Sequence, residues 1–384
     1  MGVDHRDDPR VERRHPVLPR DHRRVHRRLG GDGAGPPRLP HRPGSPRRSA
    51  RTLAPRTRVT TAAVPVWVIG ARGLLGASLV EALAADPRWA PVAGDPLPWE
   101  TSEEAVIRAA ARAGAERLLR AGRAAGRWAV MWCAGAAVTG STREQLAHEL
   151  GQLEAVLDEI AVALDAAPAP GGALFYSSSA GGVYAGAAHP PFTEATEPRP
   201  LAPYGEAKLR AEGLVRAFGH RAGVSTLVGR IANLYGPRQA VGKPQGLITQ
   251  LARANLSPTP ASIYVPLETV RDYLYADDCA LLVRDATMRL MELPAGAHVV
   301  KILASGQPVT ISALLGHFTA LGKARPNVML GLSPLAGYQA VDLRLESVVW
   351  PDLDERDTMP LPAGIHITAQ ALIAGMQSGE LTPR

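Results

Sequence analysis

The chain has 384 residues, which is enough for one large domain or two smaller ones. Its formal net charge of +7 is unevenly placed, because 16 of the 43 basic residues but only six of the 36 acidic ones lie in residues 1–60. The remainder is mildly acidic, so the overall charge does not favour a globular nucleic-acid-binding protein. No apolar run approaches the roughly 18 residues that are needed to span a membrane.

Cysteine and histidine usage excludes two further classes of protein. Cys133 and Cys279 are the only cysteines and lie far apart in the chain, so they predict neither a disulfide framework nor a zinc site. No histidines are spaced as metal ligands beside an acidic residue, and we expect no bound metal. The first residues lack the apolar segment of a secretory signal peptide. We therefore expect a cytoplasmic protein.

Residues 1–60 form an arginine-rich arm without aromatic residues or a periodic apolar pattern. Such a segment buries too little apolar surface to offset the entropy of ordering, so we expect disorder. Blocks of positive charge bind phosphate without sequence preference, which makes a nucleic-acid-binding arm one interpretation. The alternatives are a solvated tail, or an upstream stretch that is not translated, with the working protein beginning near Val59. N-terminal sequencing of the native protein distinguishes these alternatives.

A buried strand followed by a glycine-rich turn and a helix begins the globular part. Residues 64–69 are continuously apolar, as in a parallel strand, and residues 74–84 have a helical pattern. Glycines between them allow a tight turn, a close approach of the backbone to a pyrophosphate, and close packing of helix on strand. The helix N-terminus favours a negatively charged phosphate. The sequence therefore predicts cofactor-binding residues at Gly70, Arg72, Gly73, Leu74, Leu75 and Gly76.

The choice between NAD and NADP depends on two residues with opposite preferences. Asp95 lies 19 residues beyond Gly76, near the position of an acid that accepts a hydrogen bond from the free 2′-hydroxyl of NAD. Arg72 could instead pair with the 2′-phosphate of NADP. NAD is favoured slightly, although Asp95 is almost as easily interpreted as an ordinary loop acid.

Alternating strands and helices continue to residue 235. Residues 129–135 and 173–179 have the pattern of buried strands, and residues 142–166 that of a long amphipathic helix. This alternation predicts a Rossmann-type, doubly wound parallel sheet over residues 64–235. Ligands bind such sheets at the carboxyl ends of the strands, where Ala134, Gly135 and the serines at 177–179 fall.

Tyr204 and Lys208 lie four residues apart at the start of a predicted helix. This spacing places them on one helical face, and Pro203 suits the first helical position. A lysine ammonium near the phenol favours the phenolate and lowers its pKa from the usual value near 10. Such a pair could move a proton to or from a sugar hydroxyl or carbonyl. In isolation, however, two solvated side chains at this spacing are commonplace.

Taken together, the motifs resemble the extended short-chain dehydrogenase/reductases, in the NAD-dependent epimerase/dehydratase family that acts on nucleotide sugars. The resemblance covers the chain from about residue 64 onward. It rests on the glycine turn and on an ordered set of segments at 178–184, 191–194, 203–208, 230–239 and 271–278. It also implies a smaller C-terminal α/β substrate lobe over residues 236–384, with some strands and helices returning to the main sheet.

The resemblance implies roles for individual residues. Tyr204 would be the catalytic acid/base, and Lys208 would tune it while holding the nicotinamide ribose. Asn233 would lie near the sugar diphosphate, and Arg271 would clamp its phosphates with a bidentate geometry. The alternatives are that Asn233 only caps a turn and that Arg271 forms a structural ion pair with Asp272.

The serine loop departs from the family pattern. One extra small residue precedes Val183, so the catalytic hydroxyl is assigned to Ser179, with Ser178 in reserve, although Ala180 falls at that place when counted from Val183. No Asp-Glu pair stands at 180–183, where sugar 4,6-dehydratases carry their elimination acid and base, which argues against a dehydratase. The usual aspartate that contacts the adenine is not evident between Asp95 and residue 128.

Three functional hypotheses follow from these observations. The favoured one is a nucleotide-sugar 4-epimerase-like enzyme, in which hydride passes to and from the nicotinamide. The first alternative is a nucleotide-sugar 4-ketoreductase, and the second is a non-catalytic NAD(P)-binding regulatory protein. The family resemblance also implies a homodimer, in which helices at 142–166 and 204–220 form a four-helix bundle.

Overall fold

The computed structural model describes residues 62–94, 96–101, 103–239, 246–322 and 325–378. The predicted basic arm and Asp95 lie outside the described residues. Within the described part of the chain, no helix is both long and apolar enough to cross a membrane.

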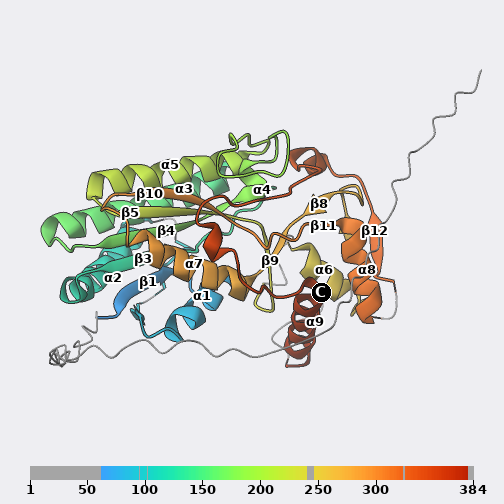
Figure 1. The fold of residues 1–384 in the computed structure, drawn as a ribbon, viewed down its shortest axis with the longest axis horizontal. Helices are drawn as coiled ribbons and strands as arrows, with labels where there is room; N and C mark the ends of the chain where they lie inside the picture. The colour runs from blue at the N-terminus through green and yellow to red at the C-terminus, as the bar shows by residue number, and fades with distance from the viewer. Residues whose placement is uncertain (1–61, 95, 102, 240–245, 323–324, 379–384) are drawn as a thin grey trace, which may run out of the picture. The chain divides into compact units, whose positions relative to one another are not determined.

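A six-stranded parallel sheet forms the centre of the molecule, as predicted (Figure 1). The strand order is β10-β5-β4-β3-β1-β2, and every neighbouring pair is parallel. The last of these six strands in sequence, β10, therefore joins the sheet beside β5. The strands are β1 (Val64–Ile69), β2 (Trp89–Pro91), β3 (Trp128–Trp132), β4 (Gly172–Ser179), β5 (Ser225–Ile231) and β10 (His298–Leu303).

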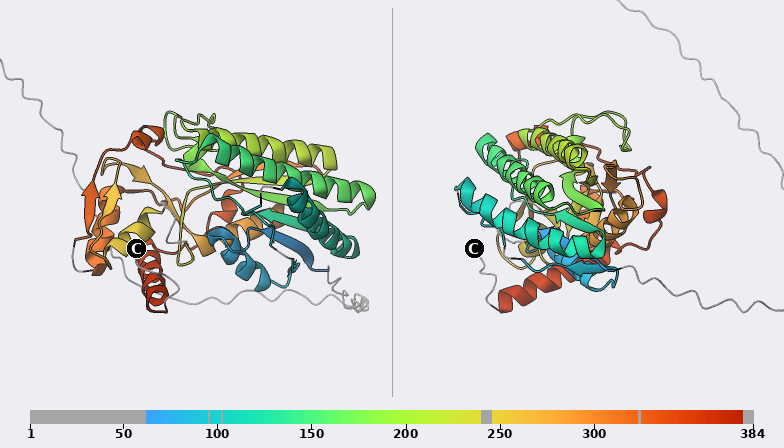
Figure 2. Two further views of the ribbon diagram at one scale, coloured as in Figure 1. Left: turned by 180° about the vertical axis from the view of Figure 1, so that it is seen from behind. Right: turned by 90° about the vertical axis from the view of Figure 1, so that its left-hand side faces the viewer.

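Helices cover both faces of this sheet (Figures 1 and 2). Because neighbouring strand residues point to opposite faces, Val130 and Leu174 belong to one buried cluster, and Met131 and Phe175 to the other. The first cluster lies under α2 (Glu104–Ala125), α3 (Arg143–Ala166) and α5 (Pro203–Ala222). The second lies under α1 (Leu74–Ala84) and α7 (Ala276–Leu290). The doubly wound fold predicted from the sequence is thus confirmed.

A smaller group of C-terminal elements lies beyond one end of the sheet (Figure 1). Its apolar cluster is separate from the two that flank the sheet. The helices are α6 (Leu247–Ala254), α8 (Ile311–Gly322) and α9 (Leu361–Gln377). Three short strand pairs join β6 (Asn233–Tyr235) to β9 (Tyr273–Tyr275), β7 (Ala261–Ile263) to β12 (Val328–Leu330), and β8 (Val270–Arg271) to β11 (Val309–Thr310).

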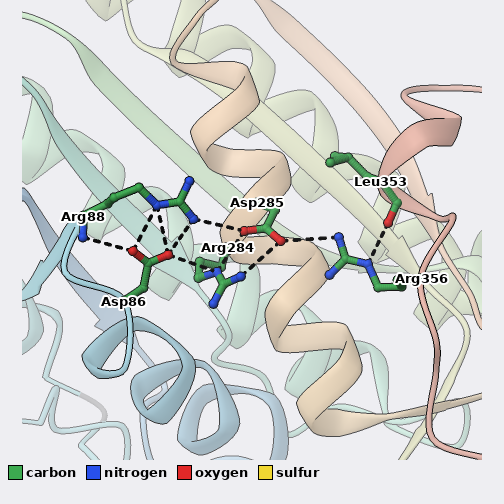
Figure 3. Close-up of polar contacts among 6 residues, drawn as sticks. All are labelled: Asp86, Arg88, Arg284, Asp285, Leu353 and Arg356. Carbon is green, nitrogen blue, oxygen red and sulfur yellow. Dashed lines mark hydrogen bonds and ion pairs between the residues drawn. The ribbon is translucent and has the colours of Figure 1, made fainter.

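An ion-pair network joins the segment before α9 to helix α7 and to the loop between α1 and β2 (Figure 3). Arg88, just before β2, donates to both carboxylate oxygens of Asp86, and these hydrogen bonds lower the pKa of Asp86. Arg284 on α7 lies between Asp86 and Asp285. Arg356, from the segment before α9, reaches Asp285 at 3.3 Å. Because these side chains share partners, the network orients three separate segments relative to one another.

Candidate active site

The glycine turn joins β1 to α1 with very little space. Gly70 has a φ of +86°, a left-handed conformation that suits glycine. The Gly73 N–H donates to the Gly70 carbonyl at 2.9 Å. A Cβ at Gly76 would lie only 2.1 Å from the Gly70 carbonyl oxygen. Helix and strand therefore approach as closely as the sequence pattern predicts, because no side chain stands between them.

Replacing Gly76 by alanine is expected to weaken NAD(P) binding at least tenfold and to lower the free energy of unfolding by about 1–3 kcal/mol. The added methyl group would push against the backbone of the turn, which cannot move aside as a flexible side chain would. Isothermal titration with NAD(P) and urea unfolding measure the two effects. Gly316→Ala in α8 is the control, since nothing lies within 4 Å of its Cβ position. A Gly76→Ala variant that behaves like wild type would contradict this role.

A cavity of about 1030 Å³ opens from the glycine turn along the carboxyl ends of β1 and β3 to the start of α5. This volume is at the upper end of the range for cofactor sites. Leu74, Leu75 and Gly76 were also predicted to bind the cofactor, but they do not line the cavity, and Leu75 and Gly76 are buried inside α1. The predicted residues that do line it are Gly70, Arg72, Gly73, Ala134, Gly135, Tyr204 and Lys208.

Tyr204 and Lys208 both face this cavity from the first turns of α5. Pro203 occupies the start of the helix, as expected from its missing N–H. The Lys208 ammonium lies 5.8 Å from the centroid of the Tyr204 ring. Burial alone would lower the pKa of Lys208, but attraction to Tyr176, Tyr204 and Glu149 outweighs it, and the net pKa is raised. Lys208 therefore remains a cation at neutral pH.

Tyr176 is a second phenol beside Lys208 that the sequence analysis missed. Lys208 Nζ donates to Tyr176 Oη at 3.4 Å and to the Ser177 carbonyl at 3.3 Å. Burial raises the pKa of Tyr176, in spite of the opposing effect of Lys208. Only the period-two alternation of β4, which places Tyr176 on the face covered by α5, could have indicated this contact.

The two candidate serines have different surroundings. Ser179 Oγ accepts from the Gly182 N–H at 3.1 Å, and a Cβ at Gly182 would lie 3.0 Å from Cε1 of Tyr204, so Ser179 lies close to Tyr204. Ser178 is 5% exposed and donates to Glu212 Oε1 at 2.6 Å, inside the protein. Neither serine lines the cavity itself. The geometry argues against the reserve choice, because the Ser178 hydroxyl is already bound to Glu212.

A buried polar network anchors the face of α5 that carries Tyr204 and Lys208. Glu212, one turn beyond Lys208, accepts from Arg230 Nε at 3.1 Å and Nη2 at 2.7 Å. Arg230 Nη1 also donates to the Tyr184 hydroxyl at 2.7 Å, which in turn donates to the Thr193 carbonyl at 3.0 Å. Burial would lower the pKa of Arg230, but the hydrogen bonds that it donates to Glu212 and the negative charge of Glu212 raise this pKa overall.

Asn233 and Arg271 do not line the cavity. Asn233 lies in β6 and Arg271 in β8, and the two are close because the Asn233 N–H donates to the carbonyl of Asp272. Arg271 donates to the carbonyls of Val270 and Ala340, both at 2.8 Å, and to Gln339 Oε1 at 3.2 Å. The alternative of an Arg271–Asp272 ion pair is wrong, because the Asp272 carboxylate accepts from the Ser305 N–H instead. Burial lowers the pKa of Arg271.

Two predicted residues bear on the choice between NAD and NADP. Arg72 lines the cavity and is exposed. Asp95 lies outside the described residues, although Gly94 and Pro96 on either side of it line the cavity. Within the described ranges, no group of three or more acidic, histidine or cysteine side chains could hold a metal ion.

Curated relatives match parts of the chain. This chain is 36% identical to a dTDP-glucose 4,6-dehydratase of Neisseria gonorrhoeae over 89 residues. The matched stretch covers 23% of this chain and 25% of that protein. This chain is also 28% identical over 142 residues to a dTDP-4-dehydro-6-deoxyglucose reductase of Escherichia coli, covering 37% and 43% of the two chains. The chain therefore matches less than half the length of these relatives.

Solved structures share the fold over most of the chain. A UDP-glucose 4-epimerase of Thermotoga maritima with UDP-glucose has a TM-score of 0.65 at 19% identity, covering 82% of this chain and all of that one. A UDP-glucuronic acid 4-epimerase of Bacillus cereus with UDP-glucuronic acid and NAD has a TM-score of 0.64 at 18% identity, with 81% and 99% covered.

The sequence itself settles the family. The model of the NAD dependent epimerase/dehydratase family matches residues 66–298, which is more than half of the chain. This range includes the glycine turn, both candidate serines, and the Tyr204–Lys208 pair. The chain belongs to the NAD dependent epimerase/dehydratase family.

Proposed function

We propose that this protein is an NAD(P)-dependent enzyme that acts on a nucleotide sugar, with 4-epimerisation as its leading activity. The observation that carries the proposal is that Tyr204 and Lys208 line the same cavity as the glycine turn. A dinucleotide site and a proton-transfer pair therefore share one space.

The residues present fit NAD(P). The turn at Gly70 and Gly73 lets the backbone approach a pyrophosphate, and the N-terminus of α1 has no side-chain cap that would compete with it. The cavity then continues to Lys208 at its other end. NAD is favoured over NADP by the sequence position of Asp95, whereas the exposed Arg72 would suit a 2′-phosphate. When bound, the cofactor supplies the acceptor and donor of a hydride.

Tyr204 is the proposed acid/base for the sugar hydroxyl. Its phenolate would take the hydroxyl proton as the carbon is oxidised and return it as the carbon is reduced. Lys208 would favour the phenolate by its charge, and Tyr176 and the Ser177 carbonyl hold its ammonium in place. Ser179 is the proposed donor to the reacting oxygen, through its position beside Gly182 and Tyr204.

Arg271 is the proposed diphosphate ligand, with Asn233 nearby. Its guanidinium is buried, its hydrogen bonds go to neutral acceptors, and among the described residues no carboxylate forms an ion pair with it. A buried charge without a counterion is costly unless a ligand supplies one. The diphosphate of a nucleotide sugar would supply two negative charges in a geometry that suits a guanidinium.

The second candidate function is a nucleotide-sugar 4-ketoreductase, which the partial match to a 4-keto-sugar reductase favours. Other matches are to dehydratases. We do not propose dehydration, because the segment 180–183 contains only alanine, glycine and valine and provides no acid or base for elimination.

Two measurements test the function. The purified protein is denatured and the supernatant assayed for NAD and NADP, and the native protein is then incubated with UDP-, GDP- and dTDP-sugars. We expect one dinucleotide to be released and one 4-epimer to be formed with no net change in cofactor oxidation. Consumption of NAD(P)H with a 4-keto sugar would identify the reductase. A protein that holds a dinucleotide but converts no sugar nucleotide would support the regulatory alternative.

We also propose a cytoplasmic homodimer. α3 and α5 lie side by side on one face of the sheet (Figure 2), so two copies could pair these helices as a four-helix bundle. Both cysteines are free thiols, in keeping with a reducing compartment. Sedimentation equilibrium is expected to give twice the chain mass, and a monomer at micromolar concentration would exclude this arrangement.

A further inference from the structure

Glu149 on α3 lines the cavity. One of its carboxylate oxygens, Oε1, accepts from the backbone N–H groups of Ala136 and Ala137, both at 2.6 Å. These bonds fix the segment that follows β3. They also fix the direction of the carboxylate, because one oxygen is held by two donors.

The other oxygen, Oε2, accepts no hydrogen bond from the described residues. It lies 3.7 Å from the position that a Cβ on Gly135 would occupy, and Lys208 Nζ lies 3.9 Å from the same position. Gly135 has a φ of +150° and no side chain to cover this point. A free acceptor and a charged donor therefore flank one bare patch of backbone inside the cavity.

This arrangement is complementary to a vicinal diol. Each hydroxyl of a diol can donate one hydrogen bond and accept others, so a carboxylate on one side and an ammonium on the other satisfy it. Hydrogen bonds to charged partners are roughly twice as strong as neutral ones. The patch lies beyond β3 beside Lys208, whereas the lining residues 92–94 follow β2, which is two strands away in the sheet.

We propose that Glu149 is a further cofactor-binding residue, whose Oε2 accepts a hydrogen bond from the ribose diol on the nicotinamide side, opposite Lys208. This inference rests on the proposed function, since it assumes a dinucleotide in the cavity. Glu149 would contact the nicotinamide ribose, whereas the acid expected from the sequence at the adenosine ribose is Asp95.

Glu149→Gln separates this binding role from a purely structural one. The amide oxygen of glutamine can still accept from Ala136 and Ala137, whereas the NH₂ group replaces the free acceptor with a donor. The matched control is Glu154→Gln, the same substitution at an exposed position of the same helix.

The experiment compares two ligands that differ by the second ribose. Full-length wild type, Glu149→Gln and Glu154→Gln, each freed of co-purified nucleotide, are titrated calorimetrically with ADP-ribose and with ADP. We expect Glu149→Gln to raise the Kd for ADP-ribose about tenfold, as the loss of one charged hydrogen bond would. The Kd for ADP should stay within about twofold of the wild-type value.

Equal weakening of both ligands would overturn the proposal, because it would mean that only the segment after β3 had been disturbed. Unchanged binding of ADP-ribose would overturn it as well. If wild type binds ADP-ribose and NAD, and Glu149→Gln binds them equally well, only the role of Glu149 is overturned and the proposed function stands. Wild-type protein that binds no dinucleotide would overturn both proposals.

Discussion

Tyr204→Phe is expected to lower kcat by about 10²- to 10⁴-fold, the usual contribution of a positioned acid/base, while NAD(P) stays bound. The substitution removes only the hydroxyl, and the ring continues to pack against Gly182 and Lys208. The loss should therefore appear in turnover and not in the amount of dinucleotide released on denaturation. Turnover on the best nucleotide sugar and the cofactor content of the purified variant are measured together.

Tyr264→Phe is the matched control for this experiment, because Tyr264 is 46% exposed and does not line the cavity. It should retain wild-type turnover. If Tyr204→Phe also turned over at the wild-type rate, another group would have to carry the proton and the proposed mechanism would be wrong. If Tyr204→Phe lost its cofactor as well as its activity, the loss of turnover would be explained by a role of Tyr204 in cofactor binding and not in proton transfer.

Arg230→Met is expected to lower the free energy of unfolding by about 3–5 kcal/mol, the cost of leaving a buried charge without its partner. The side chains of Arg230 and Glu212 are only 7% and 9% exposed, and two hydrogen bonds join them. Removing the guanidinium would leave Glu212 buried with Ser178 as its remaining donor. Urea unfolding followed by circular dichroism measures the difference.

Two further variants distinguish burial from charge as the cause of this loss. Arg199→Met breaks an exposed pair with Glu197, whose side chains are 64% and 76% exposed, and should cost no more than about 1 kcal/mol. Removing both charges, with Arg230→Met and Glu212→Leu together, should recover part of the stability, because no buried carboxylate remains unpaired. A loss below about 1 kcal/mol for Arg230→Met alone would show that water reaches this network.

The sequence by itself determined the features that depend on near neighbours in the chain. The parallel strands, the glycine turn and the first turn of α5 follow from apolar runs, from glycines at a fixed spacing, and from Pro203 before an apolar-periodic stretch. The placement of Tyr204 and Lys208 on one face is equally local, since residues four apart on a helix always share a face. The order of these segments was enough to predict a doubly wound sheet.

Only the tertiary structure decided which side chains meet across segments that are distant in sequence. The sequence favoured Ser179 over Ser178 without excluding either, and the structure shows that the Ser178 hydroxyl is bound by Glu212 whereas Ser179 accepts from the Gly182 N–H. Tyr176 contacts Lys208 from a strand, and Glu149 attracts it from a helix, although both elements precede it by dozens of residues. Arg271 proved to have backbone carbonyls as partners in place of Asp272. The periodicity of a helix or strand predicts the direction of a side chain relative to its own backbone. The partner of that side chain depends on which elements pack together.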